Sequence, residues 1–129
     1  MTGAPQNAFV LVIEDDDAIR QSIIDALELE GFEGKGFADG NEAIRFLNRT
    51  QQEPRVILLD MMMAGMNGWQ FLDYQRNHKT LSLVPVIVCS ALSETARSVS
   101  PAAVLPKPIQ LKSLIDAVKV HFDSAAEEI

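Results

Sequence analysis

The sequence Val56-Ile57-Leu58-Leu59-Asp60-Met61-Met62-Met63 places four aliphatic residues directly before a single carboxylate. A short apolar run of this kind indicates a strand that is buried on both faces, as in a parallel sheet. Asp60 then lies at the carboxyl end of the strand, which is the edge where ligands bind in open α/β sheets. For Asp60 taken alone, the alternative is a strand-ending residue that caps the next turn.

Similar apolar runs occur at residues 9–13, 86–89 and 102–105, and residues 32–37 form a weaker predicted strand with glycines at positions 34 and 36. They alternate with segments in which apolar residues recur at helical spacing. Five strand–helix alternations predict an α/β fold with a flavodoxin-like, doubly wound, five-stranded parallel sheet in the order 2-1-3-4-5. The segment 93–100 has a thin apolar face, so we expect the fourth helix to be short or irregular.

The chain length of 129 residues fits one domain, which we place at residues 9–123 between tails at 1–8 and 124–129. Its composition, 47% hydrophobic and 22% charged, is ordinary for a soluble globular protein. The net charge of −7 argues against nucleic acid or an anionic membrane as a direct partner, because both attract positive charge.

The single cysteine, Cys89, lies in an apolar run and has no cysteine with which to pair. A reduced thiol in the core of an intracellular protein is the expected state. No apolar run approaches the roughly 20 residues that span a bilayer, and the first residues lack the pattern of a signal peptide. The sequence therefore predicts a cytoplasmic protein.

Helix-capping residues give the expected ends of the first helix. Asp17 is predicted to cap its start, and Gly31 its end. We interpret Gly34 and Gly36 in the second strand as flexibility at a sheet edge. They form no dinucleotide-binding fingerprint, which argues against a flavin- or nucleotide-binding protein on the same fold.

Polar residues follow four of the predicted strands, and parallel strands bring their carboxyl ends to one edge of the sheet. These residues are Glu14 with Asp15, Asp60, Ser90 and Lys107. Crowded carboxylates repel one another, and a divalent cation and Lys107 are the two groups that can hold all of them ionised. Oxygen ligands select a hard ion, and a small cluster that keeps several waters suits Mg²⁺.

These residue types predict a specific chemistry. Asp60 can act as a nucleophile without a general base, because a carboxylate is already ionised at neutral pH. Mg²⁺ and Lys107 are suited to neutralise a phosphoryl group, and the Ser90 hydroxyl to donate to one of its oxygens. The product is an aspartyl phosphate. Each residue alone also has a plainer interpretation, as a capped turn, a strand-end serine or an exposed loop lysine.

With these residues in place, the sequence resembles the receiver domain of two-component response regulators from about residue 9 to residue 122. The resemblance rests on four motifs. They are Val12-Ile13-Glu14-Asp15, the run from Asp60 to Gly68, Ser90-Ala91 and Lys107-Pro108.

The resemblance implies that Asp60 takes a phosphoryl group from a histidine kinase or phosphotransfer protein. It also implies that Asp15 and Asp60 ligate Mg²⁺, that Glu14 acts through water, and that the main-chain carbonyl of Met62 is a further ligand. Lys107–Pro108 is expected to be a cis peptide bond. Signalling is expected to work by phosphorylation-dependent binding of a downstream protein, with the domain acting as a phospho-acceptor rather than an enzyme.

Three features depart from the family pattern. Ala64 replaces the usual proline after the phospho-acceptor, Val104 replaces the usual aromatic before the lysine, and the interval from Ser90 to Lys107 is short. Because the usual switch couples the hydroxyl to that aromatic, the alternative hypothesis is a phosphorylation-independent protein-interaction module on the same fold.

Two further expectations concern lifetime and output. Met62 and Leu92 flank the phosphorylation site in the family pattern, and both are apolar, so they orient an attacking water poorly. We therefore predict slow self-dephosphorylation. The sequence ends shortly after the last predicted helix, so the module is expected either to stand alone and bind another protein or to be a fragment of a longer chain.

Overall fold

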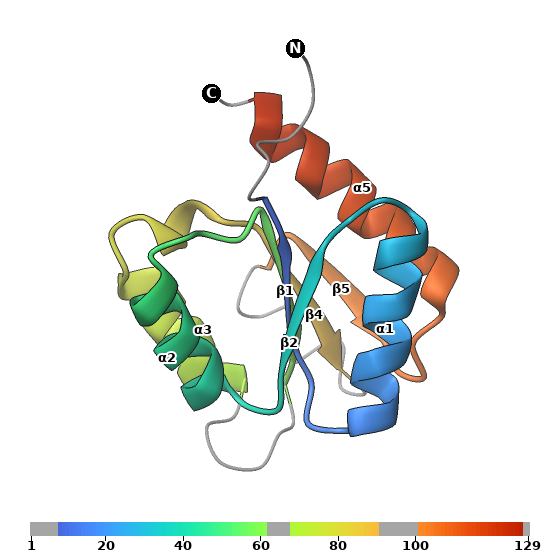
Figure 1. Ribbon diagram of the computed structural model, residues 1–129, viewed down its shortest axis with the longest axis horizontal. Helices are drawn as coiled ribbons and strands as arrows, with labels where there is room; N and C mark the ends of the chain where they lie inside the picture. The colour runs from blue at the N-terminus through green and yellow to red at the C-terminus, as the bar shows by residue number, and fades with distance from the viewer. Residues whose placement is uncertain (1–7, 62–67, 91–100, 128–129) are drawn as a thin grey trace.

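The computed structural model describes residues 8–61, 68–90 and 101–127. Its centre is a parallel five-stranded sheet in the order β2-β1-β3-β4-β5, which confirms the predicted topology (Figure 1). The strands are β1 (Val10–Ile13), β2 (Gly34–Phe37), β3 (Val56–Asp60), β4 (Val86–Ser90) and β5 (Ala103–Pro106).

Helices cover both faces of this sheet, with α1 and α5 on one face and α2 and α3 on the other (Figure 1). Their bounds are α1 (Asp17–Leu29), α2 (Gly40–Thr50), α3 (Gly68–Asn77) and α5 (Leu111–Glu127), with a 3₁₀ turn η1 (Leu81–Leu83) after α3. The predicted short fourth helix falls at residues 93–100, outside the described residues.

The two faces of the central strands fill two separate cores, because successive strand residues point to opposite sides. In β3, Val56 and Leu58 pack with α1 and α5, whereas Ile57 and Leu59 pack with α2 and α3. All five residues of β3 are buried, Asp60 included. Burial on both faces explains why this strand reads as a continuous apolar run.

The start of α1 differs from the prediction, because Asp16 caps the helix and Asp17 is its first residue. The Asp16 carboxylate accepts a hydrogen bond from the backbone N–H of Ile19 at 2.9 Å. Asp16 has the extended backbone of an N-cap, whereas Asp17 already lies within the helix. Gly31 follows the helix with a positive φ of 88°, as expected of a C-terminal glycine.

The edge strand β2 begins at Gly34, two residues later than predicted. Its glycines lie against α1: a Cβ at Gly34 would be 3.3 Å from Leu27 Cδ1, and one at Gly36 would be 2.6 Å from Ile24 Cδ1. Close packing of a helix against the strand therefore accounts for these glycines better than the predicted flexibility of a sheet edge.

The final helix runs to Glu127 and so extends into the segment 124–129 that was predicted as a tail. No glycine or proline interrupts residues 111–127, and the helix continues through Ser124-Ala125-Ala126. Before it, the Lys107–Pro108 peptide bond is cis, as predicted. Within the described residues, no helix is both long and apolar enough to cross a membrane.

Candidate functional site

Asp60 ends β3 at the carboxyl edge of the sheet, where its side chain is only 2% exposed. Lys107 directly follows β5, two strands away, and its Nζ donates to Asp60 Oδ1 at 2.8 Å. An ion pair so far apart in sequence forms because parallel strands deliver their ends to one edge. The predicted proximity of Asp60 and Lys107 is confirmed.

Glu14 and Asp15 follow β1, the neighbour of β3, and complete an acidic cluster with Asp60. Each of the three residues offers a carboxylate oxygen, and these oxygens lie within 4.8 Å of one another. Glu14 and Asp60 are buried, whereas Asp15 is exposed, so the cluster opens to solvent on one side. An all-oxygen donor set with an open side fits Mg²⁺, which keeps several of its waters.

The crowding of the acidic cluster changes how Glu14 titrates. Burial, together with the negative charge of Asp60, raises the pKa of Glu14 from 4.5 to about 7. The backbone N–H of Asp16 and the charge of Lys107 oppose this rise without cancelling it. The ionised cluster is therefore unfavourable by itself, as expected for a site that awaits a cation.

Lys107 keeps its positive charge within this edge. Its partial burial lowers the pKa, but the hydrogen bond to Asp60 and the charges of Asp60 and Glu14 outweigh burial, and the pKa is raised above 10.5. Lys107 is thus a fixed cation beside Asp60.

Ser90 is the buried last residue of β4, and its backbone carbonyl accepts from the backbone N–H of Lys107 at 3.2 Å. This bond holds the end of β4 beside the end of β5, and so places Ser90 and Lys107 next to each other. Cys89 precedes Ser90 and pairs with Asp60 across the strands. Burial and the Asp60 charge raise the pKa of the Cys89 thiol to about 12, so it stays protonated, in line with the predicted reduced core thiol.

Gly68 begins α3 and packs directly on the end of β3. A Cβ at Gly68 would lie 2.5 Å from Met61 Cα and 3.0 Å from the Asp60 carbonyl oxygen, and its N–H donates to the Met61 carbonyl. A glycine here allows the chain after Asp60 to return close to the site. Met62, whose carbonyl was predicted as a ligand, and Ala64 lie outside the described residues.

Arg20 of α1 is a site neighbour that the sequence reasoning did not identify. Its Nη1 donates to the backbone carbonyl of Glu14 at 2.8 Å, and its Nη2 pairs with the carboxylate of Asp17. The spacing of Asp17 and Arg20 on one helix face is visible in the sequence. The bond to Glu14 is not, because its acceptor is a backbone atom.

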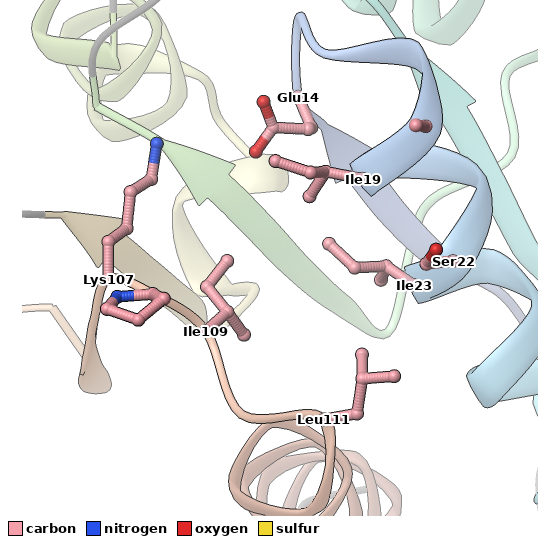
Figure 2. A pocket seen from close by; sticks show the side chains of 9 residues that line it. Glu14, Ile19, Ser22, Ile23, Lys107, Ile109 and Leu111 are labelled. Carbon is pink, nitrogen blue, oxygen red and sulfur yellow. The ribbon is translucent and has the colours of Figure 1, made fainter.

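A groove lies beside the acidic cluster, between α1 and the segment that joins β5 to α5 (Figure 2). Its volume is about 380 Å³, with Glu14 and Lys107 at one end and an apolar lining beyond them. The lining includes Ile19 and Leu111, which are 43% and 42% exposed. The carboxyl edge therefore combines a charged site with an adjoining apolar surface.

The response regulator receiver domain family model matches residues 10–119 of this chain. The chain belongs to this family, whose members are the receiver domains of two-component response regulators. The structural neighbours include the receiver domain of the Francisella response regulator 1452, which is 32% identical with a TM-score of 0.79. That match covers 92% of this chain and 98% of the Francisella one.

Two curated relatives are longer than this receiver domain. The phosphate regulon transcriptional regulatory protein PhoB of Escherichia coli K12 is 30% identical over 115 residues, covering 85% of this chain and 49% of PhoB. The DNA-binding response regulator MtrA of Mycolicibacterium smegmatis is 27% identical over 124 residues, covering 92% of this chain and 52% of MtrA. The chain spans about half the length of these curated relatives.

Proposed function

We propose that this receiver domain accepts a phosphoryl group on Asp60 from the phosphohistidine of a histidine kinase or phosphotransfer protein. The observation that carries the proposal is the meeting of three carboxylates within 4.8 Å of one another, with Lys107 bonded to one of them. Family membership and the position of Asp60 at the carboxyl edge support the same conclusion.

In the proposed transfer, a carboxylate oxygen of Asp60 attacks phosphorus. A new O–P bond forms while the N–P bond of the donor breaks, and the imidazole nitrogen keeps the electron pair. Bound Mg²⁺ would supply positive charge to the phosphoryl oxygens. Asp15 and Asp60 would hold the ion, with Glu14 acting through water and the Met62 carbonyl as a further ligand.

Lys107 and Ser90 are proposed to bind the transferred group. The Lys107 amine already sits 2.8 Å from Asp60 Oδ1 and carries a charge opposite to that of a phosphoryl group. Ser90 lies at the end of the adjacent strand, where its hydroxyl is a suitable donor to a phosphoryl oxygen. A backbone hydrogen bond between Lys107 and Ser90 joins the two residues at adjacent strand ends, which favours a fixed geometry.

Acetyl phosphate with Mg²⁺ provides the simplest test, because it removes the need to know the natural donor. We expect the intact mass of the wild-type chain to rise by one phosphoryl group, and Asp60→Asn to abolish this gain. Asp73→Asn, an exposed carboxylate on α3, is the matched control and should be labelled like the wild type. Failure to label the wild type contradicts the proposal.

The groove beside the site supports a protein as the natural donor, because it offers apolar surface next to Glu14 and Lys107. Ile19→Asn makes that surface polar without adding charge beside Glu14. We expect this variant to take phosphate from acetyl phosphate at the wild-type rate. Phosphotransfer profiling with the organism's histidine kinases should then show slower transfer, and equal transfer would argue against docking in the groove.

The phosphorylated form is proposed to be long-lived, with the domain acting as an acceptor rather than an enzyme. Met62 and Leu92, the flanking residues on which this rests, lie outside the described residues. The measurement is the decay of the labelled mass after acetyl phosphate is removed. Loss of the label within seconds would contradict slow self-dephosphorylation.

A phosphorylation-independent interaction module is the second candidate, favoured by Val104. This residue of β5 packs against the core on the α2 and α3 face, in the place of the usual aromatic switch residue. Backbone amide NMR spectra before and after labelling distinguish the two functions. Changes that reach β5 and α5 support a phosphorylation-dependent output, whereas changes confined to the strand ends near Asp60 favour the alternative.

A further inference from the structure

Arg20 holds the turn between β1 and α1 through a backbone atom and a side chain. Its guanidinium donates to the Glu14 carbonyl at 2.8 Å and to the Asp17 carboxylate. The Arg20 side chain is 20% exposed and that of Asp17 is 87% exposed. The bond to the Glu14 backbone is therefore the more shielded of the two, and a charged donor makes it a strong one.

Gly36 of β2 provides the space in which the Arg20 side chain lies. A Cβ at Gly36 would be 3.0 Å from both Cγ and Cδ of Arg20, and 2.6 Å from Cδ1 of Ile24 beside them. Gly36 pairs with Val12 in β1, close to where the acidic turn begins. The neighbouring Gly34 approaches α1 as well, but a Cβ there would meet Leu27 and Ile24 instead of Arg20.

With Arg20 in place, Glu14 is held at three points. Its backbone N–H donates to the Phe37 carbonyl at 3.0 Å, and its carbonyl accepts from Arg20. Its carboxylate accepts from the backbone N–H of Asp16 at 3.0 Å. Hydrogen bonds therefore anchor both peptide groups that flank Glu14. One of them, which contains the Glu14 carbonyl, joins Glu14 to Asp15.

We propose that Arg20 is a positioning residue for the cation site, and that Gly36 keeps its place open. The inference rests on the proposed function, in which Glu14 and Asp15 serve the Mg²⁺ ion. Arg20 acts through the Glu14 carbonyl: it fixes the turn so that both carboxylates face Asp60. Residues that orient metal ligands in this way typically change metal affinity by about 10–100-fold when they are removed.

The sign of the effect separates positioning from simple electrostatics. Arg20 is a cation near a cation site, so removing its charge alone should strengthen Mg²⁺ binding. Loss of a positioning bond should weaken it. Arg20→Met is the informative variant, because it keeps an apolar stem against Gly36 while it removes both the charge and the donor.

Calorimetric titration of the folded chain with Mg²⁺ alone tests the proposal without any phosphodonor. We expect Arg20→Met to bind Mg²⁺ about tenfold more weakly than the wild type, and Arg20→Lys to recover part of the loss. Gly36→Ala should also bind more weakly, although it changes no charge. Gly34→Ala is its matched control and should bind like the wild type. Circular dichroism checks that each variant is folded.

Unchanged or tighter Mg²⁺ binding by folded Arg20→Met overturns the inference. If that variant does not fold, the comparison of Gly36→Ala with Gly34→Ala decides, and equal affinities overturn it. Wild-type protein that binds no Mg²⁺ overturns the proposed function as well. If the wild type binds Mg²⁺ and the Arg20→Met and Gly36→Ala variants bind it equally well, only the positioning role of Arg20 is overturned.

Discussion

Gln75 and Glu14 are both buried polar residues, 4% and 3% exposed, but their surroundings differ. Gln75 lies in α3, and its Nε2 donates to the carbonyls of Leu81 and Val84 at 3.0 and 3.4 Å. Glu14 lies at the carboxyl edge of the sheet, where the negative charge of Asp60 opposes its own. Gln75 is thus stabilised by hydrogen bonds to its neighbours, whereas Glu14 is repelled by the charge of Asp60.

The difference separates polar burial that stabilises the fold from polar burial that serves a site. The Gln75 amide ties α3 to η1 and to the entry of β4, so its bonds contribute to stability. The acidic cluster destabilises the unliganded fold and becomes favourable when a cation and a phosphoryl group neutralise it. Variants in the two places should therefore shift stability in opposite directions.

The largest expected effect is that of Gln75→Ala. It removes a buried donor from two carbonyl groups and leaves a cavity between α3 and η1. We expect a loss of about 3 kcal/mol in the free energy of unfolding, measured by urea denaturation. A loss below about 1 kcal/mol would show that the hydrogen bonds of the buried Gln75 amide contribute little to stability.

The free energy of unfolding should depend on pH because the pKa of Glu14 is raised in the folded chain. Its pKa in the folded chain is about 7 and its usual value is 4.5. Between these values the folded chain holds more protons than the unfolded chain, so stability falls as pH rises through this window. We expect a fall of up to about 2 kcal/mol without Mg²⁺, and a flatter profile in Glu14→Gln.

Glu28→Gln is the control for this pH experiment, since Glu28 is an exposed residue near the end of α1, away from the acidic cluster. Its profile should follow that of the wild type. A wild-type stability that stays level or rises from pH 4.5 to 7 would contradict the direction assigned to Glu14.

Asp60→Asn should stabilise the fold in the absence of Mg²⁺, although it abolishes phosphorylation. It removes the charge that repels Glu14, at the cost of the ionic bond to the partly exposed Lys107. We expect a gain of about 1 kcal/mol in urea denaturation at neutral pH. A clear loss of stability would mean that the pairing with Lys107 outweighs the carboxylate repulsion.

The smallest effect is expected at the surface pair of Lys112 and Asp116, which are 3.0 Å apart on α5. Both side chains are more than half exposed, so water and salt screen the pair. Asp116→Asn should change the free energy of unfolding by less than about 0.5 kcal/mol. A change comparable to that of Gln75→Ala would mean that burial does not determine how much a polar interaction contributes to the stability of this fold.

The sequence was sufficient for the parts of the fold in which one signal dominates. The apolar runs of β1, β3 and β4 are buried on both faces, so their composition alone predicts central parallel strands. The topology then brings Asp60 and Lys107 together, and this pairing was predictable before any coordinates were known.

The features that the sequence did not predict depend on contacts with residues distant in sequence, or on a choice among several equivalent residues. A run of four acidic residues offers several possible helix caps, and only the backbone conformation selects Asp16. The close approach of α1 explains Gly36, and a backbone acceptor explains Arg20, but neither leaves a periodic signal. The raised pKa of Glu14 likewise reflects its burial in the folded chain and, to a smaller extent, the charge of Asp60 on a neighbouring strand.

Crystals of the wild-type protein soaked in Mn²⁺, a substitute for Mg²⁺ with a measurable anomalous signal, would show where the cation binds. We expect one ion at the carboxyl edge of the sheet, bound by the carboxylates of Asp15 and Asp60, with Glu14 reached through water. An ion bound elsewhere, with that edge empty at saturating Mn²⁺, would contradict this expectation.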